Sequence, residues 1–439
     1  MNDILQQLRA DHLAGRRGGL YAVCSSRREV LEAAIALSRD HGRPLLVEAT
    51  ANQVNQFGGY TGMTPQAFAS RVGAMAAAMG FPRENLLLGA DHLGPYAWRK
   101  EPAAAAMAKA AELARRCVEA GFDKLHLDAA FGCSDDPPQG LPLEVAAERT
   151  ADLCRAAETA AERLPGSRPR PYYVIGAEVP IPGGTVDNPE QIQVTRPEDV
   201  AEFLAQTESR FRKAALSGAW ERLLAVIVQP GVEFGNFSVA RYVPAKASAL
   251  TAFHRNLPGV MTYEIHSTDY QTPDALTRMV ADHFPLLKAG PCLTNAFREA
   301  VFALEAMEAE RLISMRDAAP SNLRRVMEQL MLQHPVHWRS HYRGTEEECR
   351  RMRLDSRLDR IRYYWEYPEA QAALERLHAN LAPAVPADLV VQFFADHAAI
   401  LSPGEPALNP AEIIRRRIQK ALRPYLSACA APTPKNPMV

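Results

Sequence analysis

The sequence predicts an α/β protein built as a (β/α)8 TIM barrel with a helical C-terminal extension. Eight short apolar runs, rich in β-branched residues, predict strands at 20–25, 45–50, 86–92, 124–130, 172–179, 223–230, 260–266 and 286–292. Longer stretches with helical spacing of apolar residues separate these runs, and such alternation predicts a parallel sheet. Eight units favour a closed barrel, and an open doubly wound sheet is the alternative.

The connecting segments carry helix signals in chain order. Among the helical stretches, for example 26–42, 64–80 and 103–121, several open at Ser, Thr or Pro and close at Gly, which are residues that begin and end helices. After about residue 316 the pattern changes to helices and loops, and Asn409 and Pro410 are placed to begin the last helix. We therefore predict a barrel over residues 1–315, a helical extension over 316–425 and a flexible tail over 426–439.

Composition excludes several classes of protein. The 439 residues hold 50 Lys and Arg against 51 Asp and Glu, and this balance argues against a nucleic-acid or anionic-membrane partner. No apolar run is long enough to cross a membrane and the N-terminus lacks a signal-peptide pattern, so we expect a cytoplasmic protein. The seven scattered cysteines predict neither disulfides nor a zinc knot. No glycine-rich nucleotide motif follows any predicted strand.

Polar side chains stand where the predicted strands end, which is where barrels carry their chemistry. Buried charges cost several kcal/mol unless they are paired or bound to a metal, so these residues predict one shared site. The predicted ligands of a divalent metal ion are His92, Glu178, Gln229 and His266. Zn²⁺ fits these donors best, with Mn²⁺ or Co²⁺ as alternatives. A hydrogen-bond network without metal is the competing interpretation.

Three carboxylates are the candidate acids and bases. Asp91 precedes His92 at a predicted strand end, and Asp128 and Glu264 end two other strands. Asp128 and Glu264 each have a structural role as the alternative. His126 shares a strand face with Asp128, which suits either a partner of the site or a hydrogen-bonded core histidine.

The segment from Ala49 to Thr64 is rich in amides and glycines, which suits binding of a hydroxyl-rich ligand. A rigid Ω-like loop is the alternative. In this part of the chain the predicted substrate-binding residues are Glu48, Asn52, Gln53, Gln56, Gly58 and Tyr60.

A phosphate group needs cations or backbone N–H groups at a helix start. Ser267, Lys288, Thr294 and Arg298 follow the seventh and eighth strands, where barrels often hold phosphate. The stretch 354–367 is expected to reach over the barrel mouth with Arg360 as a clamp, and Arg357 and Arg362 as alternatives. A docking helix fixed by Arg–Asp pairs explains the same stretch equally well.

Long strings of this chain resemble the GatZ/KbaZ-like family: VEATANQVNQFGGYTGM, GADHLGP, LHLDAA, GAEVPIPGG, VQPGVEFG, YEIHSTDYQT, LKAGPCLTNAFREAVFALE and DSRLDRIRYYW. The resemblance implies a fold similar to the metal-dependent class II aldolases. It implies that Asp91 and His92 match the aldolases' catalytic Asp and a metal His, with Glu178 and His266 near the metal. Gln229 stands where an aldolase has another His.

The family includes non-catalytic subunits of tagatose-1,6-bisphosphate aldolase, proteins labelled tagatose-6-phosphate kinases, and C4 epimerases. From this resemblance we expect an isomerase: a metal-dependent epimerase that interconverts D-tagatose 6-phosphate and D-fructose 6-phosphate by retro-aldol cleavage and re-addition. The metal would polarise the C2 carbonyl, Asp91 would take the C4 hydroxyl proton, and Asp128 or Glu264 would serve the other face.

The alternative function is that of a non-catalytic subunit that stabilises a class II aldolase. The expected partners are a phosphorylated ketohexose and either further copies of the chain or an aldolase subunit, and an unphosphorylated ketohexose stays possible as ligand.

Overall fold

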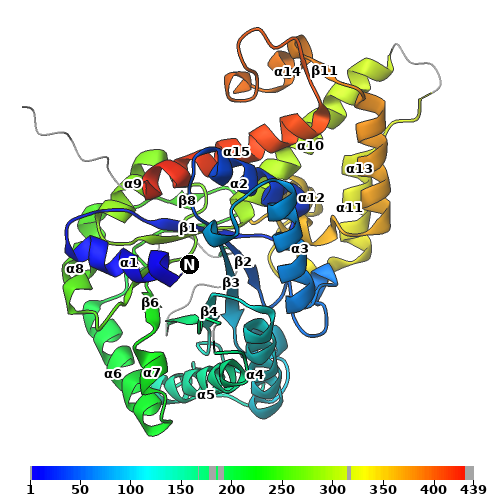
Figure 1. Ribbon diagram of the computed structural model, residues 1–439. Coiled ribbons are helices and arrows are strands. Elements are labelled where there is room, and N and C mark those ends of the chain that lie inside the picture. Colours follow the sequence, from blue (N-terminus) through cyan, green and yellow to red (C-terminus); the bar gives the residue numbers. More distant parts are fainter. Residues whose placement is uncertain (1, 167, 177–183, 186–191, 314–317, 431–439) are drawn as a thin grey trace, which may run out of the picture.

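The computed structural model describes residues 2–166, 168–176, 184–185, 192–313 and 318–430, and its centre is a closed parallel barrel (Figure 1). The strands are hydrogen-bonded in the order β1-β10-β9-β6-β5-β4-β3-β2. Their bounds are Leu20–Cys24 (β1), Leu45–Thr50 (β2), Leu86–Leu93 (β3), Lys124–Leu127 (β4), Tyr172–Ile175 (β5), Leu223–Ile227 (β6), Thr262–Ile265 (β9) and Leu286–Ala289 (β10). Each lies within a predicted run or exceeds it by one residue, and the predicted (β/α)8 fold is confirmed.

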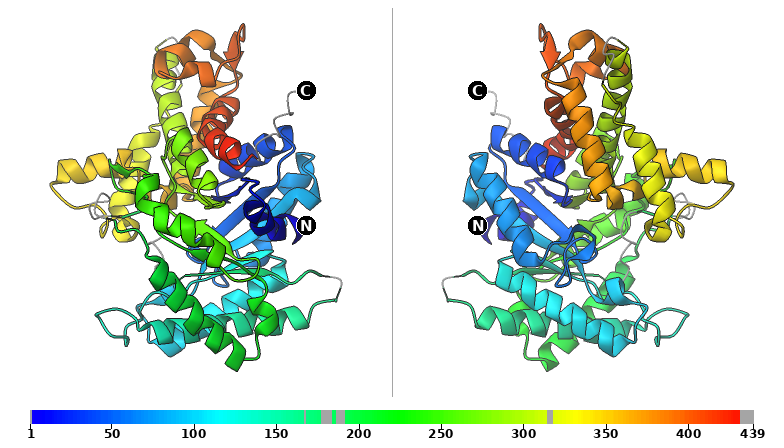
Figure 2. Two further views of the ribbon diagram at one scale, coloured as in Figure 1. Left: turned by 90° about the vertical axis from the view of Figure 1, so that its left-hand side faces the viewer. Right: turned by 90° about the vertical axis from the view of Figure 1, so that its right-hand side faces the viewer.

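Helices surround the barrel (Figures 1 and 2). Their bounds are Arg28–Asp40 (α2), Pro65–Ala78 (α3), Ala103–Ala120 (α4), Leu143–Glu162 (α5), Pro197–Lys213 (α6), Ser217–Trp220 (α7), Pro244–Phe253 (α8), Pro273–Ala281 (α9) and Pro291–Leu312 (α10). Alternate strand residues face opposite ways. In β1, Leu20 and Ala22 join an apolar cluster inside the barrel, whereas Tyr21 and Val23 join the larger cluster beneath the helices. The strands are therefore buried on both faces.

Helix α1 (Asn2–Leu13) closes the end of the barrel where the strands begin. Leu5 and Leu8 are buried in the inner apolar cluster. The Arg9 guanidinium donates hydrogen bonds to the backbone carbonyls of His254 (2.5 Å) and Leu257 (3.1 Å), just before β9. This end of the barrel is filled by packing, which leaves the opposite end for a site.

Three histidines join α1 to the barrel. His12 Nε2 donates to the carbonyl of Gly18 (2.6 Å), so its Nδ1 carries no proton and accepts from Nδ1 of His283 at 3.0 Å. The His254 and His283 rings stack with their centroids 3.5 Å apart. Burial lowers the pKa of His12 and His254, and burial together with these two neighbours lowers that of His283 to about 3. The three imidazoles of this cluster are therefore neutral in the folded protein at pH 7.

We expect this cluster to make the protein sensitive to mild acid. A histidine has a pKa of about 6.5 in the unfolded chain, so the unfolded state takes up protons first as the pH falls. The stability contributed by His283 is complete above pH 6.5 and is lost as the pH falls toward about 3. His283→Asn keeps a donor toward His12 and should reduce the loss of unfolding free energy between pH 7 and 5.5 by roughly 1 kcal/mol. Urea titrations of the wild type and of His283→Asn at both pH values measure this difference. Equal losses of unfolding free energy in the two proteins would contradict the prediction.

The C-terminal part of the chain is helical, as predicted, and contains one small ladder. The helices are α11 (Leu323–Gln333), α12 (Glu346–Asp355), α13 (Pro368–Leu381), α14 (Ala387–Phe393) and α15 (Pro410–Cys429), with short 3₁₀ helices η6 (Pro335–His337) and η7 (Arg360–Tyr364). β11 (Val385–Pro386) pairs with β12 (Ala407–Leu408). After α12 the chain turns at Asp359, whose φ is 49°, and this turn places η7 at the barrel mouth.

Helix α15 packs against α2, α9 and α10 of the barrel (Figure 1). Asn409 caps it by accepting a hydrogen bond from the Ala411 amide at 2.8 Å. The helix continues to Cys429, because Leu426 and Cys429 are buried, so the first four residues of the predicted tail are helical. Residues 431–439 lie outside the described part of the chain, and the domain boundary at 315/316 stays a prediction. None of the described helices is long and apolar enough to cross a membrane.

Candidate functional site

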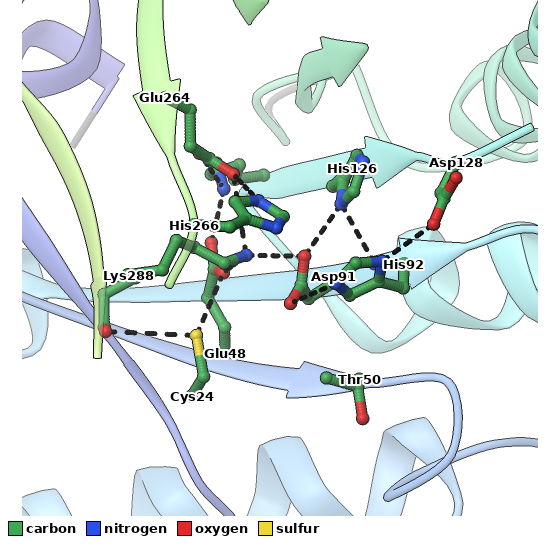
Figure 3. A network of polar contacts seen from close by, with 12 residues as sticks. Cys24, Glu48, Thr50, Asp91, His92, His126, Asp128, Glu264, His266 and Lys288 are labelled. Carbon is green, nitrogen blue, oxygen red and sulfur yellow. Dashed lines mark hydrogen bonds and ion pairs between the residues drawn. The ribbon is translucent and has the colours of Figure 1, made fainter. Parts of the chain in front are cut away.

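A buried network of ion pairs fills the barrel beneath its mouth (Figure 3). Lys124 Nζ lies 2.5 Å from Glu48 Oε1 and 2.6 Å from Glu264 Oε2. Lys288 Nζ lies 2.5 Å from Asp91 Oδ1, 3.5 Å from Glu264 Oε1, and also contacts Glu48. These side chains come from β2, β3, β4, β9 and β10, so the network ties more than half of the strands together.

The small size of Gly89 makes room for this network. In the sheet register Gly89 lies between Glu48 of β2 and Lys124 of β4. A Cβ atom at Gly89 would lie 2.6 Å from Glu48 Cγ and from Glu48 Oε1. Glycine at this position therefore lets the Glu48 and Lys124 side chains meet across β3.

The network keeps its members charged. Burial opposes the charge on Lys124, but Glu264 and Glu48 outweigh it and raise the pKa of the lysine. Burial also opposes the charge on Lys288, yet Asp91 and Glu48 hold its pKa well above the ordinary value. The pKa of Glu264 is held well below its usual range against burial, first by Lys124 and then by Lys288. The ammonium groups of Lys124 and Lys288 are therefore both in ion pairs with carboxylates.

Three histidines lie next to the network at the ends of β3, β4 and β9. The ring centroids of His92, His126 and His266 are 4.9 to 5.3 Å apart. His92 Nδ1 is 2.7 Å from Asp128 Oδ2, and His126 Nδ1 is 2.8 Å from Asp91 Oδ1. Despite burial, Asp91 and then Asp128 raise the pKa of His92, whereas burial lowers the pKa of His126 and lowers that of His266 to about 3. His126 and His266 are therefore neutral.

Four of these side chains fit a divalent metal ion. Ligand atoms of Asp91, His126, Glu264 and His266 lie within 4.8 Å of one another. His126 Nδ1 lies 2.8 Å from Asp91 Oδ1 and 3.1 Å from the backbone nitrogen of His92, whereas its buried Nε2 has no hydrogen-bond partner among the described residues. Two neutral imidazoles with carboxylates suit borderline divalent ions. The described residues thus provide a metal-compatible cluster.

This cluster differs from the predicted ligand set. His266 belongs to both. His92 Nδ1 lies against Asp128, and His92 forms with His126 and Asp128 a second group whose ligand atoms lie within 4.8 Å of one another. The structure does not bring Gln229 into the cluster, because its Oε1 accepts from the amides of Gly231 and Val232, both at 2.8 Å. Glu178 lies outside the described residues. His126, which the sequence suggested as a partner of the site or a core residue, stands in the cluster.

A cavity of about 720 Å³, counted with its open mouth, lies above the histidines. Of the predicted site residues, the following line the cavity: Asn52, Gln53, Tyr60, Asp91, His92, His266, Ser267, Lys288 and Thr294. They come from loops that follow β2 and β9, from the ends of β3 and β10, and from the first turn of α10. The cavity is therefore a polar pocket at the predicted end of the barrel.

Other predicted residues are not part of the pocket lining. Glu48, Asp128 and Glu264 are buried beneath the cavity, each at 1% exposure or less. The Gln56 amide donates to the carbonyl of Lys109 in α4 (2.9 Å), and Gly58 forms a turn with φ 99°. Of the three candidate acids and bases, only Asp91 faces the cavity.

The predicted phosphate contacts are already engaged within the protein. Arg298 pairs with Asp359 at 2.8 Å, and Arg360 Nε donates to the carbonyl of His337 at 2.6 Å. At the start of α10 the Asp269 carboxylate accepts from the amides of Gly290 (3.0 Å) and Cys292 (2.8 Å). The helix start that often binds phosphate in barrels is here capped by the chain's own carboxylate.

Several residues of the site were not among the predicted ones. Lys124 begins the run 124–130, and a period of two would have placed it on the same face as His126 and Asp128. Arg362 and Tyr363 of η7 line the cavity, and Arg362 stood only as an alternative to Arg360. The sequence held no signal to choose between them, because the turn at Asp359 decides which side chain faces the pocket. Cys24, Thr50, Phe234 and Asp269 also line it.

Comparison with known proteins identifies the family. The model of the family described as D-tagatose-1,6-bisphosphate aldolase subunit GatZ/KbaZ-like matches residues 5–430. The D-tagatose-1,6-bisphosphate aldolase subunit GatZ of Klebsiella pneumoniae subsp. pneumoniae is 44% identical over 439 residues, which cover 99% of this chain and 100% of that protein. The similarity therefore spans both the barrel and the C-terminal helices.

One solved structure shares the architecture over nearly the whole chain. The crystal structure of a probable tagatose 6 phosphate kinase from Sinorhizobium meliloti 1021 has a TM-score of 0.84 and 42% identity, covering 94% of this chain and 100% of that one. The YdjI aldolase from Escherichia coli K12 has a TM-score of 0.43 and 11% identity, covering 83% of this chain and 98% of that one. The first of these extends the full-length similarity to a solved relative.

The expectation of a C4 epimerase, and of an isomerase in general, is wrong. The family and its full-length relative are named for an aldolase subunit. The structure gives a physical reason, since Asp128 and Glu264, expected to act on the second face of a substrate, are buried in ion pairs outside the cavity lining. Matched over nearly its whole length, the chain belongs to the GatZ/KbaZ-like family of D-tagatose-1,6-bisphosphate aldolase subunits.

Proposed function

We propose that this chain is a non-catalytic subunit that binds and stabilises a class II tagatose-1,6-bisphosphate aldolase. The observation that carries the proposal is the 44% identity to a GatZ subunit across both complete chains. The paired carboxylates inside the barrel support a division of labour, because a side chain locked in a buried ion pair is poorly placed to exchange protons with a substrate. Catalysis then belongs to the partner chain.

Co-expression with a tagged class II tagatose-1,6-bisphosphate aldolase tests this proposal. We expect the two chains to elute together at a fixed ratio, and the half-life of aldolase activity at elevated temperature to lengthen. The chain purified alone should cleave no tagatose 1,6-bisphosphate. A tagged aldolase that elutes alone, with an unchanged half-life, would contradict the proposal.

The pocket further supports a phosphorylated ketohexose as ligand of this subunit. Asn52, Tyr60, Ser267 and Thr294 bring amide and hydroxyl groups to one cavity that is open to solvent, and such groups suit the hydroxyl groups of a sugar. Binding there would let the subunit respond to the sugar that its partner processes. An unphosphorylated ketohexose stays the alternative, and the calorimetry described below separates the two.

We also propose a divalent metal ion at the histidine cluster, Zn²⁺ first and Mn²⁺ or Co²⁺ as alternatives. Asp91, His126, Glu264 and His266 would hold it. When bound, such an ion acts as a Lewis acid that polarises a carbonyl oxygen. Elemental analysis of the chain purified alone measures whether it carries a metal ion.

The cytoplasmic location expected from the sequence stays a prediction.

A further inference from the structure

Beside the pocket lies a group of residues from η6 and η7 that we call the roof: His337, Arg360, Arg362 and Tyr363. Of these, Arg362 and Tyr363 line the pocket. The Tyr363 ring stands at the centre of the roof. The guanidinium carbons of Arg360 and Arg362 lie 4.6 and 4.7 Å from the ring centroid, and the His337 ring stacks on it at 4.6 Å. Tyr60, from the loop after β2, meets the same ring edge-on at 4.5 Å. The C-terminal helices and the barrel thus meet at this tyrosine.

The two positive charges of the roof have no carboxylate in contact among the described residues. Arg362 donates to the carbonyls of Leu358 (2.5 Å) and Asp359 (3.0 Å) and to the Tyr363 hydroxyl (3.2 Å). These acceptors are neutral. The carboxylate of Asp359 is in an ion pair with Arg298 instead. Partly buried guanidinium groups that contact only neutral acceptors favour an anion from outside.

The lowered pKa values of two neighbouring histidines agree with a positive potential at the roof. Burial, followed by Arg360 and Arg362, lowers the pKa of His337 to about 4. The same causes, in the same order, lower the pKa of His341 to about 3. Protonated histidines would add to the repulsion between the arginines, so the roof carries the charge of its two guanidinium groups alone.

The opposite side of the pocket has few groups that could bind a phosphate. The amides at the start of α10 are occupied by Asp269. Lys288 lines the cavity, but its ammonium group is shared between Asp91, Glu48 and Glu264. Among the Lys and Arg residues of the described lining this leaves Arg362, whose contacts are neutral oxygen atoms.

We infer that Arg362 is the residue that binds the phosphate of the pocket's ligand, assisted by the hydroxyl of Tyr363. The Tyr363 oxygen accepts from Arg362, so its own proton is free for a phosphate oxygen. The ligand then lies with its phosphate toward the roof and its hydroxyl groups toward Asn52 and Ser267. This orientation rests on the proposed ketohexose phosphate, and it makes the C-terminal helices part of the binding site.

Calorimetry on the isolated full-length chain tests the inference, with tagatose 6-phosphate, tagatose and inorganic phosphate as probes. We expect the wild-type chain to bind tagatose 6-phosphate more tightly than tagatose. Arg362→Gln should weaken binding of the phosphorylated sugar by about 10- to 100-fold and leave tagatose within about twofold. Arg362→Lys keeps the charge and should recover part of the loss.

Arg357→Gln is the matched control, because Arg357 lies in the same segment but lines no part of this pocket, and its guanidinium lies against the Tyr270 ring. It should bind all probes as the wild type does, and thermal melting checks that each variant is folded. Inorganic phosphate bound alone and lost in Arg362→Gln supports the anion site and names free phosphate as its occupant.

Equal affinity of Arg362→Gln and wild type for tagatose 6-phosphate would overturn the inference and leave the ligand proposal intact. If the wild-type chain binds none of the probes, the ligand proposal and the inference both fall. The aldolase partnership is judged separately, by co-elution, so its failure and the failure of the inference are distinguishable.

Discussion

Replacing Gly94 with alanine is expected to lower the free energy of unfolding by more than about 4 kcal/mol. Gly94 follows β3, and a Cβ atom there would lie 1.5 Å from the backbone oxygen of Asp128 and 2.6 Å from its carbonyl carbon. The φ of Gly94 is −175°, which any residue adopts, so the cost is steric. Relief requires β3 and β4 to separate, although the Asp128 amide donates to the Leu93 carbonyl at 2.9 Å.

Separation of these two strands would also move the site. Asp91 and His92 stand just before Gly94, and Asp128 bonds to His92. Gly73→Ala is the matched control, because a Cβ at Gly73 meets nothing within 4 Å and alanine is the better helix former by up to about 1 kcal/mol. Urea unfolding followed by circular dichroism measures both variants. Similar unfolding midpoints for Gly94→Ala and Gly73→Ala would refute the steric argument.

Lys124→Met should destabilise the protein by about 3 to 5 kcal/mol, because removing one partner leaves buried charges uncompensated. Methionine keeps the unbranched apolar stem of the side chain but loses the ammonium group that lies between Glu48 and Glu264. Both carboxylates are fully buried, so water cannot replace the lysine without opening the barrel. Lys288 still contacts both, which keeps the loss from being larger.

The double variant Lys124→Met, Glu264→Gln tests the cause. A neutral amide removes one of the two charges that Lys124 compensated, so we expect the double variant to recover part of the unfolding free energy lost by Lys124→Met. The deficit of Lys124→Met should also shrink as the pH falls and the unpaired carboxylates take up protons. If the double variant is less stable than Lys124→Met, lost packing rather than unpaired charge causes the effect.

The strands and the end of the barrel that carries the site could be predicted because both depend on local pattern. Apolar runs mark strands, and polar residues at strand ends mark the site. The pairing inside the site could not be predicted, because it depends on distances between strands far apart in sequence. Lys124 shows this: its apolar neighbours indicated a strand, but its two carboxylate partners lie 76 and 140 residues away.

The same limit explains the phosphate contacts. Lys288, Arg298 and the start of α10 have the composition of a phosphate site, and in the folded protein each is satisfied by a carboxylate of the chain. The choice of Arg360 over Arg362 depended on where the helix after Thr345 ends, and the left-handed turn at Asp359 has no strong sequence signature. The function was predicted wrongly for a related reason, since residue types suggested chemistry that their pairing opposes.

The position of α15 bears on how the protein is made. The helix packs on α2, α9 and α10, and the Gly19 amide at the start of β1 bonds to the carbonyl of Cys429. The start of β1 is thus covered by residues that are made long after β1 and β10. Strand β1 must wait with one edge unpaired until β10 has been made, and the seam between the two strands is covered only when α15 follows, which favours aggregation in between. A transcript cut short before codon 410 should therefore yield an insoluble barrel rather than a smaller working one.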